Sequence, residues 1–149
     1  MNIKVTADST CDLSPALLAR YDITLAPLTV MKDGASYTDG LTITPQEIFS
    51  HVAAGGSLCS TAAVSVGEYQ ALFRRFAGSC DGLIHITIGS GFSACYQNAC
   101  LAAADFPNVQ VVDSRNLSTG QGHVVLEACR LREQAASLKE LCRELEQLT

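Results

Sequence analysis

The sequence has no excess of positive charge and no long apolar run. Lys and Arg total 10 against 15 Asp and Glu, so the net charge is −5 with His neutral. This balance argues against general binding to nucleic acid or anionic membranes. The longest apolar stretch, Ala99 to Ala104, is far shorter than the roughly twenty residues of a membrane-spanning helix. Because residues 1–10 lack a basic region followed by an apolar run, no signal peptide is predicted and a cytoplasmic location is expected.

The sequence also lacks paired metal-ligand or disulfide motifs. None of its 7 cysteines forms a Cys-x-x-Cys pair, and the odd count leaves at least one thiol unpaired. Without an export signal, these residues are expected to be reduced thiols that fill small spaces in the core. The 3 histidines stand far apart, with no metal-ligand spacing. No metal site and no cofactor are therefore predicted.

The sequence does contain enough apolar material for one packed domain. Apolar residues make up 48% of the 149 residues and charged residues 17%, which argues against disorder. A chain of this size buries about two thirds of its unfolded surface. No repeat, low-complexity segment or linker divides it, so residues 1–149 are interpreted as a single domain.

Short β-branched runs alternate with helix-start signals along the chain. Strands are predicted at 3–7, 83–88 and 109–112, together with an extended segment at 23–31 that pairs with 35–37 across Asp33-Gly34. Helices are predicted to begin at Ser14-Pro15, Thr44-Pro45, Ser65 and Ser93, followed by two C-terminal helices, the second starting at Ser137. This alternation predicts an α/β fold with a mostly parallel sheet flanked by helices.

Small polar clusters follow the predicted strands or lie in the loops beside them. They are Asp8-Ser9-Thr10, Ser60-Thr61, Gly89-Ser90-Gly91-Phe92-Ser93 and Asp113-Ser114. In open α/β sheets, ligands bind beyond the carboxyl ends of the strands. Gly89 and Gly91 let the backbone come close to a ligand, and the helix predicted after them presents unpaired amides. With the Ser93 hydroxyl, this cluster predicts a site for a carboxylate or phosphate oxygen, although an ordinary serine-capped helix start also fits it.

A competing interpretation is a dinucleotide-dependent enzyme fragment. Gly89-x-Gly91-x-x-Ala94 satisfies a loose dinucleotide fingerprint between a strand and a helix. Asp113 stands at the end of the next strand, where a ribose-binding acid is expected. Against this interpretation, the fingerprint normally follows the first strand of its unit, and strands are predicted before it here. No Gly-x-Ser-x-Gly elbow occurs, and His85, inside a strand, is interpreted as a satisfied core histidine.

An ordered series of short motifs spans nearly the whole chain. It comprises Ala7–Ser14, Tyr21–Ile23, Pro27–Val30, Asp33-Gly34, Tyr37–Gly40, Ile43–Pro45, Ser60-Thr61, Ser65–Tyr69, Ser90–Ser93, Tyr96–Ala99 and Val111–Ser114. Each motif is weak alone, but their order and spacing make the combination specific. In this combination the sequence resembles the DegV family of bacterial fatty-acid-binding proteins.

The resemblance implies a protein that binds one long-chain fatty acid and has no catalytic activity of its own. In such proteins the acyl chain lies in an apolar tunnel, and a separate ATP-dependent kinase phosphorylates the carboxylate near the domain junction. Transient membrane contact is compatible with such a ligand. By resemblance, Thr61 and Ser93 are expected to hydrogen-bond the carboxylate. The residues expected to support them are Ser60, Ser90, Gly91, Asp8 and Ser9.

The sequence departs from the family pattern in composition and in length. Ala62 and Val64 replace a serine and a proline of the family, and Ala94-Cys95 replaces Gly-Thr. Family members also carry a second domain, which is expected to supply cationic residues beside the carboxylate and one wall of the tunnel. The chain is therefore expected to be a DegV-like N-terminal domain without the usual C-terminal domain. A third interpretation is an interaction domain whose site is vestigial.

Overall fold

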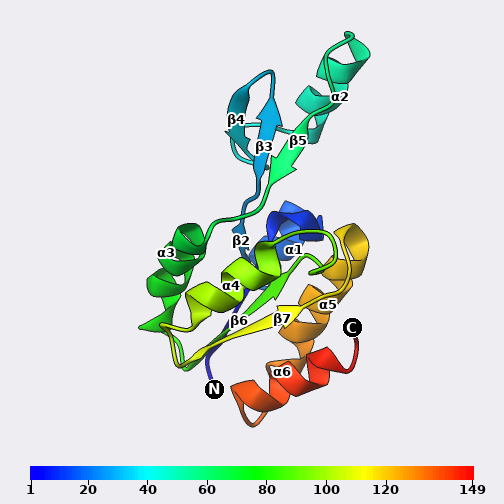
Figure 1. Ribbon diagram of the computed structural model, residues 1–149. Coiled ribbons are helices and arrows are strands. Elements are labelled where there is room, and N and C mark those ends of the chain that lie inside the picture. Colours follow the sequence, from blue (N-terminus) through cyan, green and yellow to red (C-terminus); the bar gives the residue numbers. More distant parts are fainter.

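A computed structural model describes residues 1–149 as a layered body with a projecting arm (Figure 1). The body contains a four-stranded sheet of order β2-β1-β6-β7 in which every neighbouring pair is parallel. Its strands are β1 (Ile3–Asp8), β2 (Thr24–Ala26), β6 (Gly82–Thr87) and β7 (Val109–Asp113). The predicted α/β fold with a parallel sheet is confirmed, with strand limits that differ by about a residue.

Helices cover both faces of this sheet. One face carries α5 (Ser118–Leu131) and α6 (Leu138–Glu146), with the short η1 (Ser9–Cys11) and α1 (Pro15–Arg20) beside them. The other carries α3 (Val66–Ala77) and α4 (Cys95–Ala103). Since both faces are covered, every residue of β1 and β6 is buried, as expected of central parallel strands. None of the helices combines the length and apolar character that crossing a bilayer requires.

The arm is a small antiparallel sheet of order β4-β3-β5, with a helix at its far end (Figure 1). It comprises β3 (Thr29–Lys32), β4 (Ala35–Thr38), β5 (Ser60–Ala62) and α2 (Pro45–Ala53). The β3–β4 turn is the predicted one, since Asp33 and Gly34 have φ values of 50° and 77°, both in the region that tight hairpin turns require.

The arm corrects two sequence predictions. The predicted extended segment 23–31 is not one strand, because it divides around Pro27 into β2 of the body and β3 of the arm. Proline has no N–H to continue a ladder, and the next N–H, that of Leu28, donates to the Ser9 hydroxyl at 3.2 Å. Ser60-Thr61 does not follow a strand of the parallel sheet, because it lies inside β5 of the arm.

Four of the five serine or threonine residues predicted to begin helices cap the helix that follows them. Side chains of Ser14, Thr44, Ser65 and Ser137 each accept an N–H from the first turn of the helix that follows. The prediction fails at Ser93, because α4 begins at Cys95 and Ala94 holds the capping position. Ser93 instead accepts the Cys95 N–H at 3.2 Å, a local turn that delays the helix by two residues.

The strand order has a topological switch point between β1 and β6. From β1 the chain moves to β2 on one side, whereas from β6 it moves to β7 on the other. Such a switch point opens a crevice beyond the carboxyl ends of the two strands, where ligands bind in open α/β sheets. The clusters that begin at Asp8 and Gly89 therefore meet at one edge, and the arm leaves the body from this same edge (Figure 1).

Candidate anion-binding site at the sheet edge

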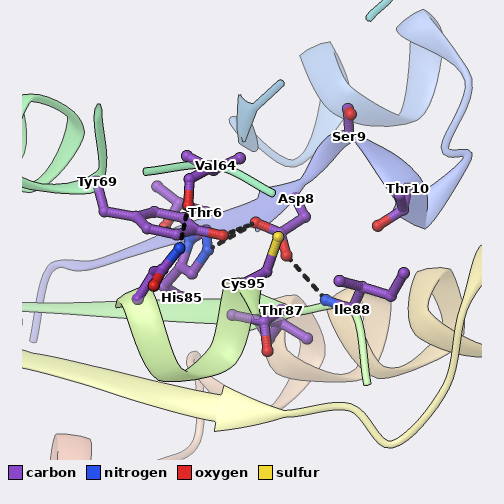
Figure 2. A network of polar contacts seen from close by, with 12 residues as sticks. Thr6, Asp8, Ser9, Thr10, Val64, Tyr69, His85, Thr87, Ile88 and Cys95 are labelled. Carbon is purple, nitrogen blue, oxygen red and sulfur yellow. Dashed lines mark hydrogen bonds and ion pairs between the residues drawn. The ribbon is translucent and has the colours of Figure 1, made fainter. Parts of the chain in front are cut away.

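A buried carboxylate at the end of β1, that of Asp8, forms hydrogen bonds with the elements around this edge of the sheet. Asp8 is fully buried, and its Oδ1 accepts hydrogen bonds from the Tyr69 hydroxyl at 2.6 Å and His85 Nε2 at 3.1 Å. Its Oδ2 accepts the Ile88 N–H at 2.9 Å (Figure 2). His85 Nδ1 pairs with Thr6 Oγ1 at 2.9 Å. This set of partners offsets the cost of burying the carboxylate.

These contacts give Asp8 a structural role. Both of its oxygens face protein donors in the interior, so Asp8 orders the strand ends and is not available to a ligand. The interpretation of His85 as a satisfied core histidine is confirmed, since it is fully buried and both ring nitrogens have partners. Burial and then the Asp8 charge raise the pKa of Tyr69 far above its ordinary value. Tyr69 therefore remains a hydrogen-bond donor at physiological pH.

The loop between β6 and α4, residues 89–94, is fastened at its start. The Gly89 N–H donates to the Asn116 carbonyl at 2.8 Å, and the Ser90 N–H donates to Asp113 Oδ1 at 3.0 Å. The backbone of the following β7–α5 loop approaches so closely that a Cβ on Gly89 would lie 2.9 Å from the Arg115 carbonyl carbon. Gly89 is thus required for this close approach, and the loop holds its shape through protein contacts alone.

Asp113 is part of this fastening, which weakens the dinucleotide interpretation. Its Oδ1 also accepts the Arg115 N–H at 2.9 Å. Burial acts to raise the pKa of Asp113, but hydrogen bonds from Ser90 and Arg115 outweigh it and the net shift is downward. A ribose-binding acid needs free carboxylate oxygens for the sugar hydroxyls, whereas Asp113 Oδ1 already accepts two backbone N–H groups that hold the loops. No contact in the structure favours a dinucleotide over another anion.

Unpaired backbone donors gather where this loop enters α4. No acceptor in the chain pairs with the backbone N–H groups of five neighbouring residues, Gly91, Ser93, Ala94, Tyr96 and Gln97. Unpaired amides and the positive end of a helix favour an anion. The half-buried Ser93 hydroxyl stands among them and donates at present only to Cys95 Sγ, at 3.2 Å. Because this O–H···S bond is weak, the hydroxyl can turn to a carboxylate oxygen at little cost.

Thr61 lies in the arm, not in the body that carries Ser93. It lies in β5 opposite Val30 of β3, and its side chain is exposed, as is that of Ser60. The chain then runs to Val64, whose carbonyl accepts a hydrogen bond from Asn98 Nδ2 at 2.9 Å. Since Asn98 belongs to α4, this bond ties the segment after Thr61 to the helix that follows Ser93.

The predicted supporting residues divide into two groups. Ser90 and Gly91 are exposed in the loop that carries Ser93. Ser9, by contrast, links the body to the arm, because its hydroxyl donates to Asp39 Oδ2 at 2.6 Å while accepting the Leu28 N–H. A cavity of about 590 Å³ opens beside Ser9, and neither Thr61 nor Ser93 lines it. Its walls are mostly apolar: Leu13, Pro15, Leu18, Leu25, Pro27, Leu41 and Pro45.

Sequence reasoning missed the residues that support this edge from inside. In the sequence, Tyr69 stands out only as the end of the Ser65–Tyr69 motif, although a buried tyrosine hydroxyl needs a partner. Gln121 belongs to none of the sequence motifs, and Asn98 stands out only as part of the Tyr96–Ala99 motif. Gln121 is buried, accepts the Thr10 hydroxyl at 2.7 Å and donates to the Ile86 carbonyl at 3.2 Å, so it joins α5 to η1 and β6.

Comparison with known proteins assigns the whole chain to one set of relatives. A family model described as "Uncharacterised protein, DegV family" matches residues 2–149. A DegV domain-containing protein of Clostridium perfringens is 32% identical over 145 residues, which are 96% of this chain and 52% of that protein. The chain therefore spans about half the length of the curated relatives it matches.

Solved structures give the same result. A DegV family protein from Thermus thermophilus, described by its fatty acid binding, superposes with a TM-score of 0.91 at 37% identity. The match covers 99% of this chain and 53% of that one. A stearic acid-binding protein from Eubacterium ventriosum superposes with a TM-score of 0.85 at 31% identity, covering 97% of this chain and 52% of that one.

Proposed function

Because the chain belongs to the DegV family, we propose that it binds a long-chain fatty acid and holds the carboxylate at the amino end of α4. The observation that carries this proposal is the group of unpaired backbone N–H groups around the Ser93 hydroxyl. Thr61 supplies a second hydroxyl from β5. Hydroxyls and helix amides together suit a carboxylate, which accepts several hydrogen bonds at once.

The donors of the proposed site carry no positive charge, which favours a site completed by a second domain. No Lys or Arg side chain donates a hydrogen bond to the loop 89–94, so the donors provided by this chain are neutral. A desolvated carboxylate without a cationic partner is costly. We therefore assign the cationic partners, and one wall of the acyl tunnel, to a second domain of the kind found in the longer relatives.

The proposed site also suits a substrate-presenting protein without its own catalytic activity. Ser90, Gly91 and Thr61 are exposed, so the carboxylate end of the ligand would remain accessible at the sheet edge. A separate ATP-dependent kinase would transfer the terminal phosphoryl group of ATP to a carboxylate oxygen and release ADP. This step rests on the family resemblance. It is tested by measuring ADP release by a bacterial fatty acid kinase with and without the oleate-loaded protein.

The direct test of ligand class is native mass spectrometry of the protein after mild extraction from a bacterial host. The expected result is a bound species whose added mass equals a fatty acid of about sixteen to eighteen carbons. A nucleotide mass would favour the dinucleotide interpretation. A bare chain that also fails to take up added oleate would favour an interaction domain with a vestigial site.

The second test removes the two hydroxyls. Thr61→Val and Ser93→Ala should each weaken oleate binding by about 1.5–3 kcal/mol, roughly tenfold to a hundredfold, because each loses a hydrogen bond to a desolvated charge. Binding is measured by calorimetric titration of a fusion between this chain and the second half of the Thermus thermophilus relative, here called the fused protein. Ser79→Ala is the matched control, since the hydroxyl of Ser79 is exposed and bonds only to the Phe76 carbonyl in α3. Unchanged affinity in both variants would exclude the assignment of these residues.

A further inference from the structure

The two ends of the loop 89–94 are held by the same buried group. At its start, the Ile88 N–H donates to Asp8 Oδ2 at 2.9 Å. At its end, Cys95 is fully buried, and its sulfur lies next to the Asp8 carboxylate and the Tyr69 hydroxyl (Figure 2). Tyr69 in turn donates to Asp8 Oδ1 at 2.6 Å. The loop is thus bracketed by one hydrogen-bonded pair, Tyr69 and Asp8 (Figure 2).

We propose that Tyr69 and Asp8 are positioning residues that set the geometry of the Ser93 hydroxyl without touching the ligand. The inference rests on the proposed function of Ser93 and goes beyond it by naming what places that hydroxyl. Both positioning residues are fully buried, so their effect on a ligand passes through Ile88 and Cys95 to the loop between them. His85 completes the arrangement, because its Nε2–H donates to the same Asp8 Oδ1 that accepts the Tyr69 hydroxyl.

The direction of the hydrogen bonds supports this role. The Ser93 hydroxyl donates to Cys95 Sγ, and its oxygen accepts the Cys95 N–H, both at 3.2 Å. Ser93 is therefore oriented by Cys95, and Cys95 is seated against Tyr69. A site held within about half an ångström of its binding geometry before the ligand arrives loses less affinity to ordering. The buried network provides this preorganisation from protein contacts alone.

The experiment combines two variants with two readouts. Tyr69→Phe removes only the hydroxyl, and Val125→Ala is the stability control, because Val125 is fully buried in the core on the other face of the sheet. In the ligand-free 149-residue chain, Tyr69→Phe should speed amide hydrogen exchange at Ile88 and Cys95 by roughly tenfold. Val125→Ala should leave the ratio of these rates to those of neighbouring β6 amides unchanged.

The second readout is oleate affinity in the fused protein. Tyr69→Phe should weaken binding about tenfold, and this loss should vanish when Ser93 is already alanine, because a positioning residue has no effect once the group it positions is gone. Losses that add in the double variant, or no loss in Tyr69→Phe, would overturn the inference. If the parent fused protein binds no oleate, the proposed function fails. The exchange rates then decide the positioning role alone, and unchanged rates at Ile88 and Cys95 overturn it.

Discussion

At the scale of single residues, the least expected feature is the buried Asp8. A carboxylate at a strand end resembles a ligand-binding group in sequence, yet here three donors converge on it: Tyr69 of α3, His85 of β6 and the N–H of Ile88, directly after β6. Removing a partner from such a buried charge is destabilising, because the remaining groups lose both water and their hydrogen bond. Asp8 thus holds this edge of the sheet together, and its replacement should lower the free energy of unfolding.

Replacing Asp8 with asparagine tests this structural role. Asp8→Asn keeps the size of the side chain but turns one acceptor into an NH2 donor that faces other donors. The free energy of unfolding should fall by about 2–4 kcal/mol, as measured by urea denaturation. Asp105→Asn is the control, since Asp105 is exposed at the end of α4 and its change should stay within about 0.5 kcal/mol. Equal stability of both variants would contradict the arrangement around Asp8.

At the scale of elements, the two glycines of the loop 89–94 have different surroundings. Gly89 lies close to neighbouring backbone, whereas Gly91 faces open space. A Cβ on Gly89 would lie 2.9–3.0 Å from backbone atoms of Arg115 and Asn116, whereas a Cβ on Gly91 would meet nothing within 4 Å. The two glycines therefore have different roles, although the sequence pattern suggests one shared role. Gly89 packs the loop against its neighbour, and Gly91 leaves a donor exposed.

The pair Gly89→Ala and Gly91→Ala separates these roles. Gly89→Ala should lower the free energy of unfolding by about 1–3 kcal/mol, because rigid backbone must move to admit the methyl group. Gly91→Ala should stay within about 1 kcal/mol of the parent protein, since its methyl group enters open space. Chemical denaturation of both variants measures the difference. The reverse order of stability would show that the loop does not pack as described.

Local sequence patterns predict most helices and strands, but they do not predict the long-range contacts between them. The caps at Ser14, Thr44, Ser65 and Ser137 were predictable because each bonds within its own first turn. The delayed start of α4 was not, because it depends on a turn that competes with the cap at Ser93. The Tyr69–Asp8 pair joins residues 61 positions apart, a contact that neither local spacing nor composition encodes. The proposed roles of Thr61 and Ser93 depend on the family resemblance for the same reason.

At the scale of the whole molecule, the arm leaves apolar side chains in solvent. Leu41, Phe49 and Leu58 are exposed by 76%, 68% and 84%, and all belong to the arm that projects from the body (Figure 1). The family relatives are about twice as long as this chain. With the proposed function, these facts predict that the chain by itself binds fatty acid weakly and self-associates more readily than the fused protein.

The energetics give the size of the expected difference between the chain alone and the fused protein. Burying an acyl chain is worth roughly 0.8 kcal/mol per methylene, but only for methylenes that leave water, so a tunnel open along one wall forfeits much of this gain. The carboxylate would also depend on neutral donors alone, without a cationic partner. Calorimetric titration with oleate should therefore show at least about hundredfold weaker binding by the chain alone, and light scattering should show concentration-dependent association through its exposed apolar side chains. Equally tight binding by a monomeric chain would show that the body and arm form a complete site, and that the second half of the relatives does not supply its wall.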